Sequence, residues 1–262
     1  MNIRGKAARE NFIIQSLSQS GSVKIIDLSK ELKVSRETIR RDLHDMEENG
    51  LLRCTHGGAV IDIHASHRYE AAAAHVKYVN EKTAIGKKAA EFIDNNDTVI
   101  ILYSTTIERI GPYLKDKNHL TVITNSFVIA EYTLKNQTNS VIMLGGDYNS
   151  SLQATTGNVT ATTLARYRAD KLFFCPSGVS KQFGVTDYPE SDADVVKSAL
   201  SVSKQSILLS DYTKFWNTGL YRVCDISDID IVISDSKLSQ VTIDEYDGES
   251  PQIVIAEDVN MD

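Results

Sequence analysis

The stretch VSRETIRRDLHDMEENGLLRCTHGGAV, residues 34–60, decides the fold of the N-terminal part of the chain. Ser35 is a good helix N-cap, because its side-chain oxygen can accept a hydrogen bond from the free N–H groups of the first turn. We expect a helix over residues 36–49, with Gly50 at its end. Its apolar residues recur at i, i+4 and i+7 and must pack inward: Ile39, Leu43 and Met46.

The other side of this helix is basic. At about 100° per residue, a broad arc that faces away from the apolar residues carries Arg36, Arg40, Arg41 and His44. Several of these side chains lie in the N-terminal half, where a helix in the major groove reaches guanine edges or phosphates. An Arg-Arg pair taken alone is more often a solvated surface than a DNA contact, so the flanking sequence has to decide between the two interpretations.

The residues before this helix predict a helix-turn-helix. Residues 9–18 have apolar side chains at helical spacing, and residues 23–32 suit a short strand followed by a helix of about two turns. Lys33-Val34 makes a tight break before the basic helix. Two short helices, a tight turn and a basic second helix are typical of a DNA-binding domain.

The residues after the basic helix predict a wing. Two small strands are expected at residues 51–53 and 59–60, joined by Cys54-Thr-His-Gly-Gly58. The glycines allow positive φ in a tight hairpin. Two side chains of this hairpin are candidates for contacts with the phosphate backbone: Arg53 and His56.

These motifs together resemble the N-terminal winged helix of DeoR-type bacterial transcriptional regulators. They are, downstream of Arg9, Ser35-x-x-Thr38-Ile39-Arg40-Arg41-Asp42-Leu43, Gly50-Leu51-Leu52-Arg53 and His56-Gly57-Gly58-Ala59. In that family, the helix carrying Thr-Ile-Arg-Arg-Asp-Leu is the recognition helix. The resemblance implies DNA contacts from Ser35, Arg36, Thr38, Arg40 and Arg41, supported at the wing by Arg53 and His56. Asp42 is expected to cap or pair within the domain, because phosphate would repel its carboxylate.

Charge is distributed unevenly along the 262 residues. Residues 1–60 contain 10 Lys and Arg against 8 Asp and Glu, a net charge of +2. The remaining residues contain 18 against 27, a net charge of −9, which gives −7 for the whole chain. This balance argues against a protein that coats a polyanion. It permits a small head that touches nucleic acid and a large body with another task.

The cysteines and the apolar runs indicate where in the cell the protein is expected. Cys54, Cys175 and Cys224 lie far apart, with no close Cys or His at metal-ligand spacing, so we expect no metal site and no cofactor. No apolar run approaches the roughly 20 residues of a membrane helix, and the N-terminus lacks a signal-peptide core. A cytoplasmic protein without a membrane partner is expected.

The rest of the chain predicts an α/β body. We expect a winged helix-turn-helix at residues 1–60, a helical or partly ordered linker at 61–79 and an α/β domain at 80–262. A helix is expected over residues 81–93. Short apolar runs then alternate with helical segments, as in a buried, mainly parallel sheet: 98–103, 120–124, 140–144, 171–175, 206–209, 230–234 and 252–256.

Small polar residues follow most of these runs. The carboxyl ends of parallel strands form one rim where ligands bind, and helix N-termini there favour anions. The residues concerned are Ser104, Thr105 and Thr106, Asn125 and Ser126, Gly145 and Gly146, Ser177 and Gly178, and Ser210 and Asp211. Such residues are also good turn and cap formers. Their recurrence on one rim favours a site for a phosphorylated small molecule.

The body also resembles the DeoR family, whose sensor domain has a sugar-phosphate-isomerase-like fold and binds phosphorylated sugars or related metabolites. The matches include Thr105-Thr106, Leu120-Thr-Val-Ile-Thr-Asn-Ser126, Leu144-Gly-Gly146, Gly184-Val-Thr186, Lys197 and Asp211-Tyr-Thr-Lys214-Phe215. The resemblance implies effector contacts from Lys197, Asp211 and Lys214. One motif departs: the family's Asp-Ser-Gly-Thr-Thr-Thr is here Leu102-Tyr103-Ser104-Thr105-Thr106-Ile107, so the acidic residue and the glycine are gone.

The leading hypothesis is a DNA-binding transcriptional repressor of carbohydrate-catabolism genes, controlled by a phosphorylated sugar and acting as a homodimer or higher homo-oligomer on paired half-sites. The alternative is a sugar-phosphate isomerase-like enzyme with a regulatory head, in which Lys197, Asp211 and Lys214 would supply acid–base chemistry. No paired carboxylate or Ser-His-Asp pattern supports it, so we expect no catalytic residue. A third reading, an adaptor whose winged helix binds protein, predicts that Arg40→Ala and Arg41→Ala leave DNA binding unchanged.

Overall fold

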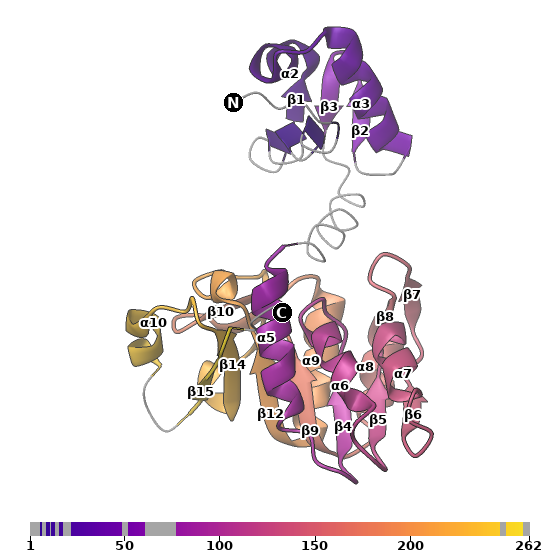
Figure 1. Ribbon diagram of the computed structural model, residues 1–262, viewed down its shortest axis with the longest axis vertical. Helices are drawn as coiled ribbons and strands as arrows, with labels where there is room; N and C mark the ends of the chain where they lie inside the picture. The colour runs from indigo at the N-terminus through magenta and orange to yellow at the C-terminus, as the bar shows by residue number, and fades with distance from the viewer. Residues whose placement is uncertain are drawn as a thin grey trace. The chain divides into compact units, whose positions relative to one another are not determined.

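A computed structural model (Figure 1) describes residues 6, 9, 10, 12, 13, 16, 17, 22–48, 52–60, 77–246 and 250–258. The chain divides into two compact units, Met1–Ala74 and His75–Asp262, which we call the head and the sensor unit. Residues 61–76, which hold most of the predicted linker and its helical stretch, lie outside the described residues. None of the helices described is both long and apolar enough to cross a membrane.

The head has the predicted order of elements. Its described residues between 6 and 17 are helical. They are followed by β1 (Ser22–Lys24), α2 (Ile25–Leu32), α3 (Arg36–Glu48), β2 (Arg53–Thr55) and β3 (Gly58–Val60). The three strands form one antiparallel sheet in the order β1-β3-β2. One core joins all parts of the head, and its largest fully buried side chains are Ile13, Ile39, Leu43 and Met46.

A tight turn sets the two helices of the head. Lys33 has a left-handed backbone, with φ 54°, and ends α2. The Ser29 hydroxyl donates a hydrogen bond to the carbonyl oxygen of Val34 at 2.8 Å, and the Val34 N–H donates to Ser29 O at 3.3 Å. These bonds satisfy backbone polar groups at the break between α2 and α3. The predicted break at Lys33-Val34 is confirmed.

The wing needs its second glycine for a reason other than the predicted one. Neither Gly57 nor Gly58 has a positive φ. Lys24 pairs with Gly58, and a Cβ atom at Gly58 would collide with the carbonyl oxygen of Val23. A Cβ at Gly57 would meet nothing within 4 Å. Close approach of β1, rather than backbone freedom, therefore demands glycine at position 58.

The sensor unit is built on a seven-stranded parallel sheet (Figure 1). Its strands are β4 (Thr98–Ile101), β5 (Thr121–Thr124), β6 (Ser140–Met143), β9 (Ala169–Phe174), β12 (Ser203–Leu209), β14 (Ile231–Asp235) and β15 (Gln252–Ala256). Their order is β15-β14-β12-β9-β4-β5-β6, and every neighbouring pair is parallel. All seven predicted runs are strands of this sheet.

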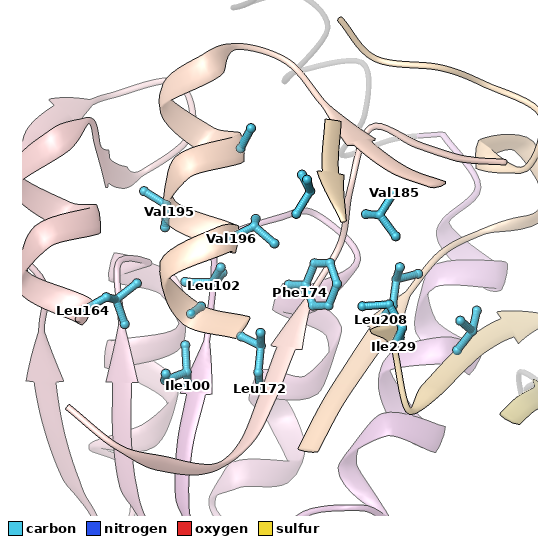
Figure 2. Packing of buried hydrophobic residues seen from close by; sticks show 14 of the residues in the cluster. Ile100, Leu102, Leu164, Leu172, Phe174, Val185, Val195, Val196, Leu208 and Ile229 are labelled. Carbon is cyan, nitrogen blue, oxygen red and sulfur yellow. The ribbon is translucent and has the colours of Figure 1, made fainter. Parts of the chain in front are cut away.

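Helices cover both faces, which explains the near-continuous apolar runs. On one face, Val99, Ile101 and Phe173 pack with α5 (Val79–Ala90), η1 (Ile107–Ile110), α6 (Gly111–Leu114) and α7 (Phe127–Thr133). On the other face, α8 (Asn158–Leu164) and α9 (Glu190–Val202) cover the sheet. Figure 2 shows Val195 and Val196 of α9 above Leu102, Leu172 and Phe174.

Short antiparallel strands, which the sequence did not predict, complete the sensor unit. β7 (Asp147–Asn149) pairs with β8 (Ala154–Thr156). β10 (Gly178–Ser180), β11 (Gly184–Asp187) and β13 (Tyr221–Cys224) form a three-stranded sheet. The remaining elements are η2 (Tyr212–Lys214), η3 (Ile226–Asp228) and α10 (Gln240–Glu245). The small sheet contributes Val185 and Val223 to the core on the α9 side.

Candidate DNA-binding and effector sites

Helix α3 presents a basic surface opposite its apolar face. Ile39, Leu43 and Met46 are buried in the head, whereas the outward side chains are exposed: Arg36, Arg40, Arg41 and His44. The cap predicted for this helix is present, since Ser35 Oγ accepts from the Thr38 N–H at 3.1 Å and lies 2.8 Å from Thr38 Oγ1. Ser35 is exposed and Thr38 half-buried at the start of the helix.

The arginines of α3 differ in their partners. Arg40 faces Glu37, with NH1 and Oε2 3.4 Å apart. Within the described part of the chain, Arg36 and Arg41 form no ion pair. An exposed guanidinium without a carboxylate partner is available to phosphate oxygens or to the edge of a guanine at no cost of breaking an ion pair.

Asp42 faces inward, as predicted, and pairs within the head. Its carboxylate accepts two hydrogen bonds from Arg9, from Nε at 2.6 Å and from NH2 at 2.9 Å. Side-chain exposure is 13% for Arg9 and 4% for Asp42, so water is largely excluded from this bidentate pair. The pair ties the N-terminal helical segment to α3 and thereby orients the recognition helix.

The wing has one described candidate contact. His56 is exposed at the turn between β2 and β3. The Gly57 carbonyl accepts from the Ile25 N–H at 3.0 Å, which holds the tip against the start of α2. Arg53 belongs to β2, but its side chain lies outside the described residues.

In the sensor unit, the chain order reverses between β4 and β9. From β4 the chain proceeds through β5 to β6 on one side, and then returns to β9 on the other side of β4. In open parallel sheets, ligands bind in the crevice outside the carboxyl ends of the strands at such a switch point. The two segments that meet there are residues 102–106 and 175–177.

A buried lysine stands at this switch point. Lys82 on α5 is 4% exposed, and its ammonium donates to Thr105 Oγ1 at 2.9 Å. Burial lowers the pKa of Lys82, and the nearby carboxylate of Asp211 opposes that shift. The half-buried Lys214 also interacts electrostatically with Lys82. Two ammonium groups beside a threonine hydroxyl suit an anionic group.

The polar residues after β4, β9 and β12 make contacts within the protein. Ser104 Oγ accepts at 3.0 Å from the N–H of Ile107, the first residue of η1. Thr106 is buried. Cys175 follows β9, its thiol neighbours the Ser104 and Thr106 side chains, and burial raises its pKa. Asp211 is buried, and its Oδ1 accepts from the Thr213 N–H at 3.0 Å and from the Thr213 hydroxyl.

Beside this cationic group lies an acidic one. The Tyr103 hydroxyl donates to Asp192 Oδ2 at the start of α9. Ser177 Oγ donates to Asp187 Oδ1 at 2.6 Å. Burial raises the pKa of Asp192 to about 6 and also raises that of Asp187. The side chain that the departing motif places at Tyr103 thus bridges from the loop after β4 to α9.

Other predicted effector residues have structural roles at the ends of β5 and β6. Asn125 is buried, with Oδ1 accepting from the Tyr103 N–H at 2.9 Å and Nδ2 donating to Thr155 O at 2.8 Å. Ser126 caps α7. Gly145 and Gly146 are exposed after β6, and a Cβ at Gly146 would collide with Thr160 Oγ1.

Lys197 lies on α9, which packs on the opposite face of the sheet from α5, the helix that carries Lys82. It is exposed on α9 and faces Asp194 on the same helix, with Nζ and Oδ1 3.7 Å apart. The three residues that sequence reasoning missed are Lys82, Asp187 and Asp192. Lys82 had a signal: it lies three residues before Ile85 and seven before Ala89, on the inward face of the helix. No local pattern marks the two aspartates.

Comparison with known proteins identifies both units. The DeoR C-terminal sensor domain matches residues 77–236, and the DeoR-like helix-turn-helix domain matches residues 9–64. The chain is 28% identical to the HTH-type transcriptional regulator GolR of Listeria innocua, over 95% of this chain and 98% of that protein. It is 30% identical to the HTH-type transcriptional repressor GlcR of Bacillus subtilis, over 94% of each.

A third relative is the lactose phosphotransferase system repressor of Staphylococcus epidermidis, 30% identical over 88% of this chain and 92% of that protein. Ribose 5-phosphate isomerase A from Neisseria gonorrhoeae matches 53% of this chain and 54% of its own at a TM-score of 0.38 and 15% identity, a likeness too weak to carry an argument. The named relatives are regulators rather than enzymes. The chain therefore belongs to the DeoR family of transcriptional regulators, with a DNA-binding helix-turn-helix head and a sensor domain.

Proposed function

We propose that this protein is a cytoplasmic repressor of carbohydrate-catabolism genes. Its hold on operator DNA is controlled by a phosphorylated sugar, which binds at the carboxyl ends of β4 and β9. Helix α3 contacts the DNA through Ser35, Arg36, Thr38, Arg40 and Arg41, and the wing supports it through Arg53 and His56. The relative named as a lactose phosphotransferase system repressor supports the carbohydrate part of this proposal.

The observation that carries the effector proposal is the buried Lys82 at the switch point. Its bond to Thr105 and its proximity to Lys214 concentrate positive charge at the crevice where parallel sheets bind ligands. A phosphate group placed there would compensate both ammonium groups and accept from the threonine hydroxyl. Ser104, Thr106, Asn125, Ser126, Gly145, Gly146 and Asp211 then shape the surrounding rim.

The acidic side of the site suits the sugar. Carboxylates of Asp187 and Asp192 are hydrogen-bond acceptors for hydroxyl groups. Asp192 contacts Tyr103 in the loop that carries Thr105, and Asp187 contacts Ser177 in the loop after β9. Lys197, which the family resemblance implicated, is exposed on α9, with Nζ 3.7 Å from Asp194 Oδ1. We assign phosphate recognition to Lys82 and Lys214, and keep Lys197 as a proposed contact with another part of the effector.

Control of DNA binding requires two arrangements of the assembly. A helix-turn-helix usually reads paired half-sites as a symmetric dimer, so the working form is a homodimer or a higher homo-oligomer. The sugar phosphate changes DNA affinity only by as much as it prefers one arrangement over the other.

In vitro transcription tests this function. The template carries the promoters upstream of this gene and its neighbours, and a panel of sugar phosphates is added together with the unphosphorylated sugars. The proposal predicts repression by the protein and a change of repression with one phosphorylated sugar only. Lys82→Met should still repress but lose the response to the sugar phosphate. Lys204→Met should keep that response, because Lys204 lies at the amino end of β12, away from the carboxyl ends of the strands, and pairs with Asp170. Repression that no sugar phosphate alters would refute the effector assignment.

A further inference from the structure

A group of potential metal ligands lies between the recognition helix and the wing. His44 and Glu47 are on the C-terminal half of α3, and Cys54 is on β2, which packs beside that helix (Figure 1). One ligand atom from each residue lies within 4.8 Å of the other two. Elsewhere in the described part of the chain, no three His, Cys, Asp or Glu side chains come this close. We propose that His44, Glu47 and Cys54 bind a divalent transition-metal ion of the zinc type.

The donor set suits such an ion. Imidazole nitrogen, thiolate sulfur and carboxylate oxygen are all zinc ligands, and three protein ligands leave a fourth position for water. With a thiolate, a carboxylate and a neutral imidazole, the site would carry two negative charges and neutralise a divalent cation. A thiolate ligand also selects against magnesium and calcium, which prefer oxygen.

The distances require only a small contraction. Zinc bonds of about 2.0–2.3 Å place tetrahedral ligand atoms roughly 3.3–3.8 Å apart. His44 Nδ1 and Glu47 Oε2 are already 3.7 Å apart. His44 is exposed, so its ring can turn without disturbing the core. Cys54 Sγ, which donates to Leu43 O at 3.5 Å, would exchange that weak bond for the metal.

The carboxylate is held in place for this role. Glu47 Oε1 accepts from the Cys54 N–H at 2.7 Å, which leaves Oε2 directed toward His44. Such a second hydrogen bond fixes the orientation of a metal-ligating carboxylate. The bound ion would join α3 to β2 and so fix the wing relative to the recognition helix. The sequence gives no hint of this site, because Cys54 is ten residues from His44 and comes near it only through the packing of β2 on α3.

Cobalt is the probe for the test. The full-length protein, with its thiols reduced, is titrated with Co²⁺ and the thiolate-to-cobalt charge-transfer absorption is recorded. The proposal predicts one ion per chain, displacement by Zn²⁺, and loss of the absorption in Cys54→Ser and His44→Ala. The double variant Cys175→Ser/Cys224→Ser should keep it. Absence of the absorption in the wild type, or its persistence in Cys54→Ser, would overturn the proposal.

A second measurement does not depend on replacing Cys54. Alkylation of each cysteine is followed by peptide mass spectrometry with and without Zn²⁺. Zinc should slow alkylation of Cys54 by about tenfold or more, as expected for a sulfur held by a metal, and His44→Ala should abolish this protection. Equal rates with and without zinc in the wild type would contradict the site.

Discussion

Arg41 is one of the α3 arginines that we propose contact DNA. It is exposed on α3 and forms no ion pair within the described residues, whereas Arg40 faces Glu37. We expect Arg41→Ala to weaken operator binding by about 1–3 kcal/mol. If Arg41 reads a base, specificity relaxes; if it contacts a phosphate, all sequences weaken alike. Anisotropy on operator and unrelated DNA measures both, with Arg168→Ala in the sensor unit as the control.

Asp42 holds the recognition helix rather than the DNA. Replacing it with alanine leaves the Arg9 guanidinium buried without its carboxylate, which should destabilise the head by about 3–5 kcal/mol. Hydrogen exchange of α3 peptides should rise accordingly. The double variant Arg9→Met/Asp42→Leu removes both charges and should recover much of the protection. Unchanged exchange in Asp42→Ala would show that the pair does not support α3.

Asp192 makes the stability of the sensor unit depend on pH. Its pKa is raised from 3.8 to about 6 by burial, so the folded state holds this proton more tightly than the unfolded state. The stabilisation is complete below about pH 4 and is lost as the pH rises through about 6. Urea unfolding followed by the single tryptophan, Trp216, reports on this unit.

Comparison with Asp192→Asn isolates this group. The unfolding free energy of the wild type, relative to the variant, should fall by up to about 3 kcal/mol between pH 4 and 6 and then stay level. Asparagine can still accept from the Tyr103 hydroxyl, so the hydrogen bond is not the variable. A constant difference across this range would rule out the raised pKa of Asp192.

At the scale of elements, the wing offers a matched pair of glycines. In Gly58→Ala the new Cβ would collide with Val23 O, so β1 and β3 must separate, at a cost of about 1–3 kcal/mol. Gly57→Ala meets nothing within 4 Å and should be nearly neutral. Hydrogen exchange of the wing peptides distinguishes the two. Equal effects would contradict the close approach of β1.

The strands of the sensor unit differ in how well the sequence predicts them. Near-continuous apolar runs identified all seven strands of the parallel sheet, because helices cover both faces of the sheet and both faces are therefore buried. The short antiparallel strands escaped prediction, since β10 and β11 have three and four residues and gain their stability from tertiary pairing. Among candidate effector residues, Thr105 followed from a strand end and Lys214 from the family resemblance. Asp192 meets Tyr103, and Asp187 meets Ser177, only through the fold.

At the scale of the whole molecule, the proposed effector bound in one unit controls DNA binding by the other. Trp216, two residues after Lys214, provides a signal for the ligand alone. A phosphorylated sugar should change its fluorescence in the wild type and in Lys204→Met, and Lys82→Met should weaken that binding by about 2 kcal/mol, because a charge-assisted bond to phosphate is lost. Equal affinity in all three proteins would remove Lys82 from the site.

The most direct measurement is fluorescence anisotropy of operator DNA with the full-length protein at fixed salt, with each sugar phosphate paired with its unphosphorylated sugar. We expect tight binding that one phosphorylated sugar shifts and its unphosphorylated counterpart leaves unchanged. Tight DNA binding that no phosphorylated sugar shifts would contradict control by a sugar phosphate, because the positive charge around Lys82 would then have no effector to bind.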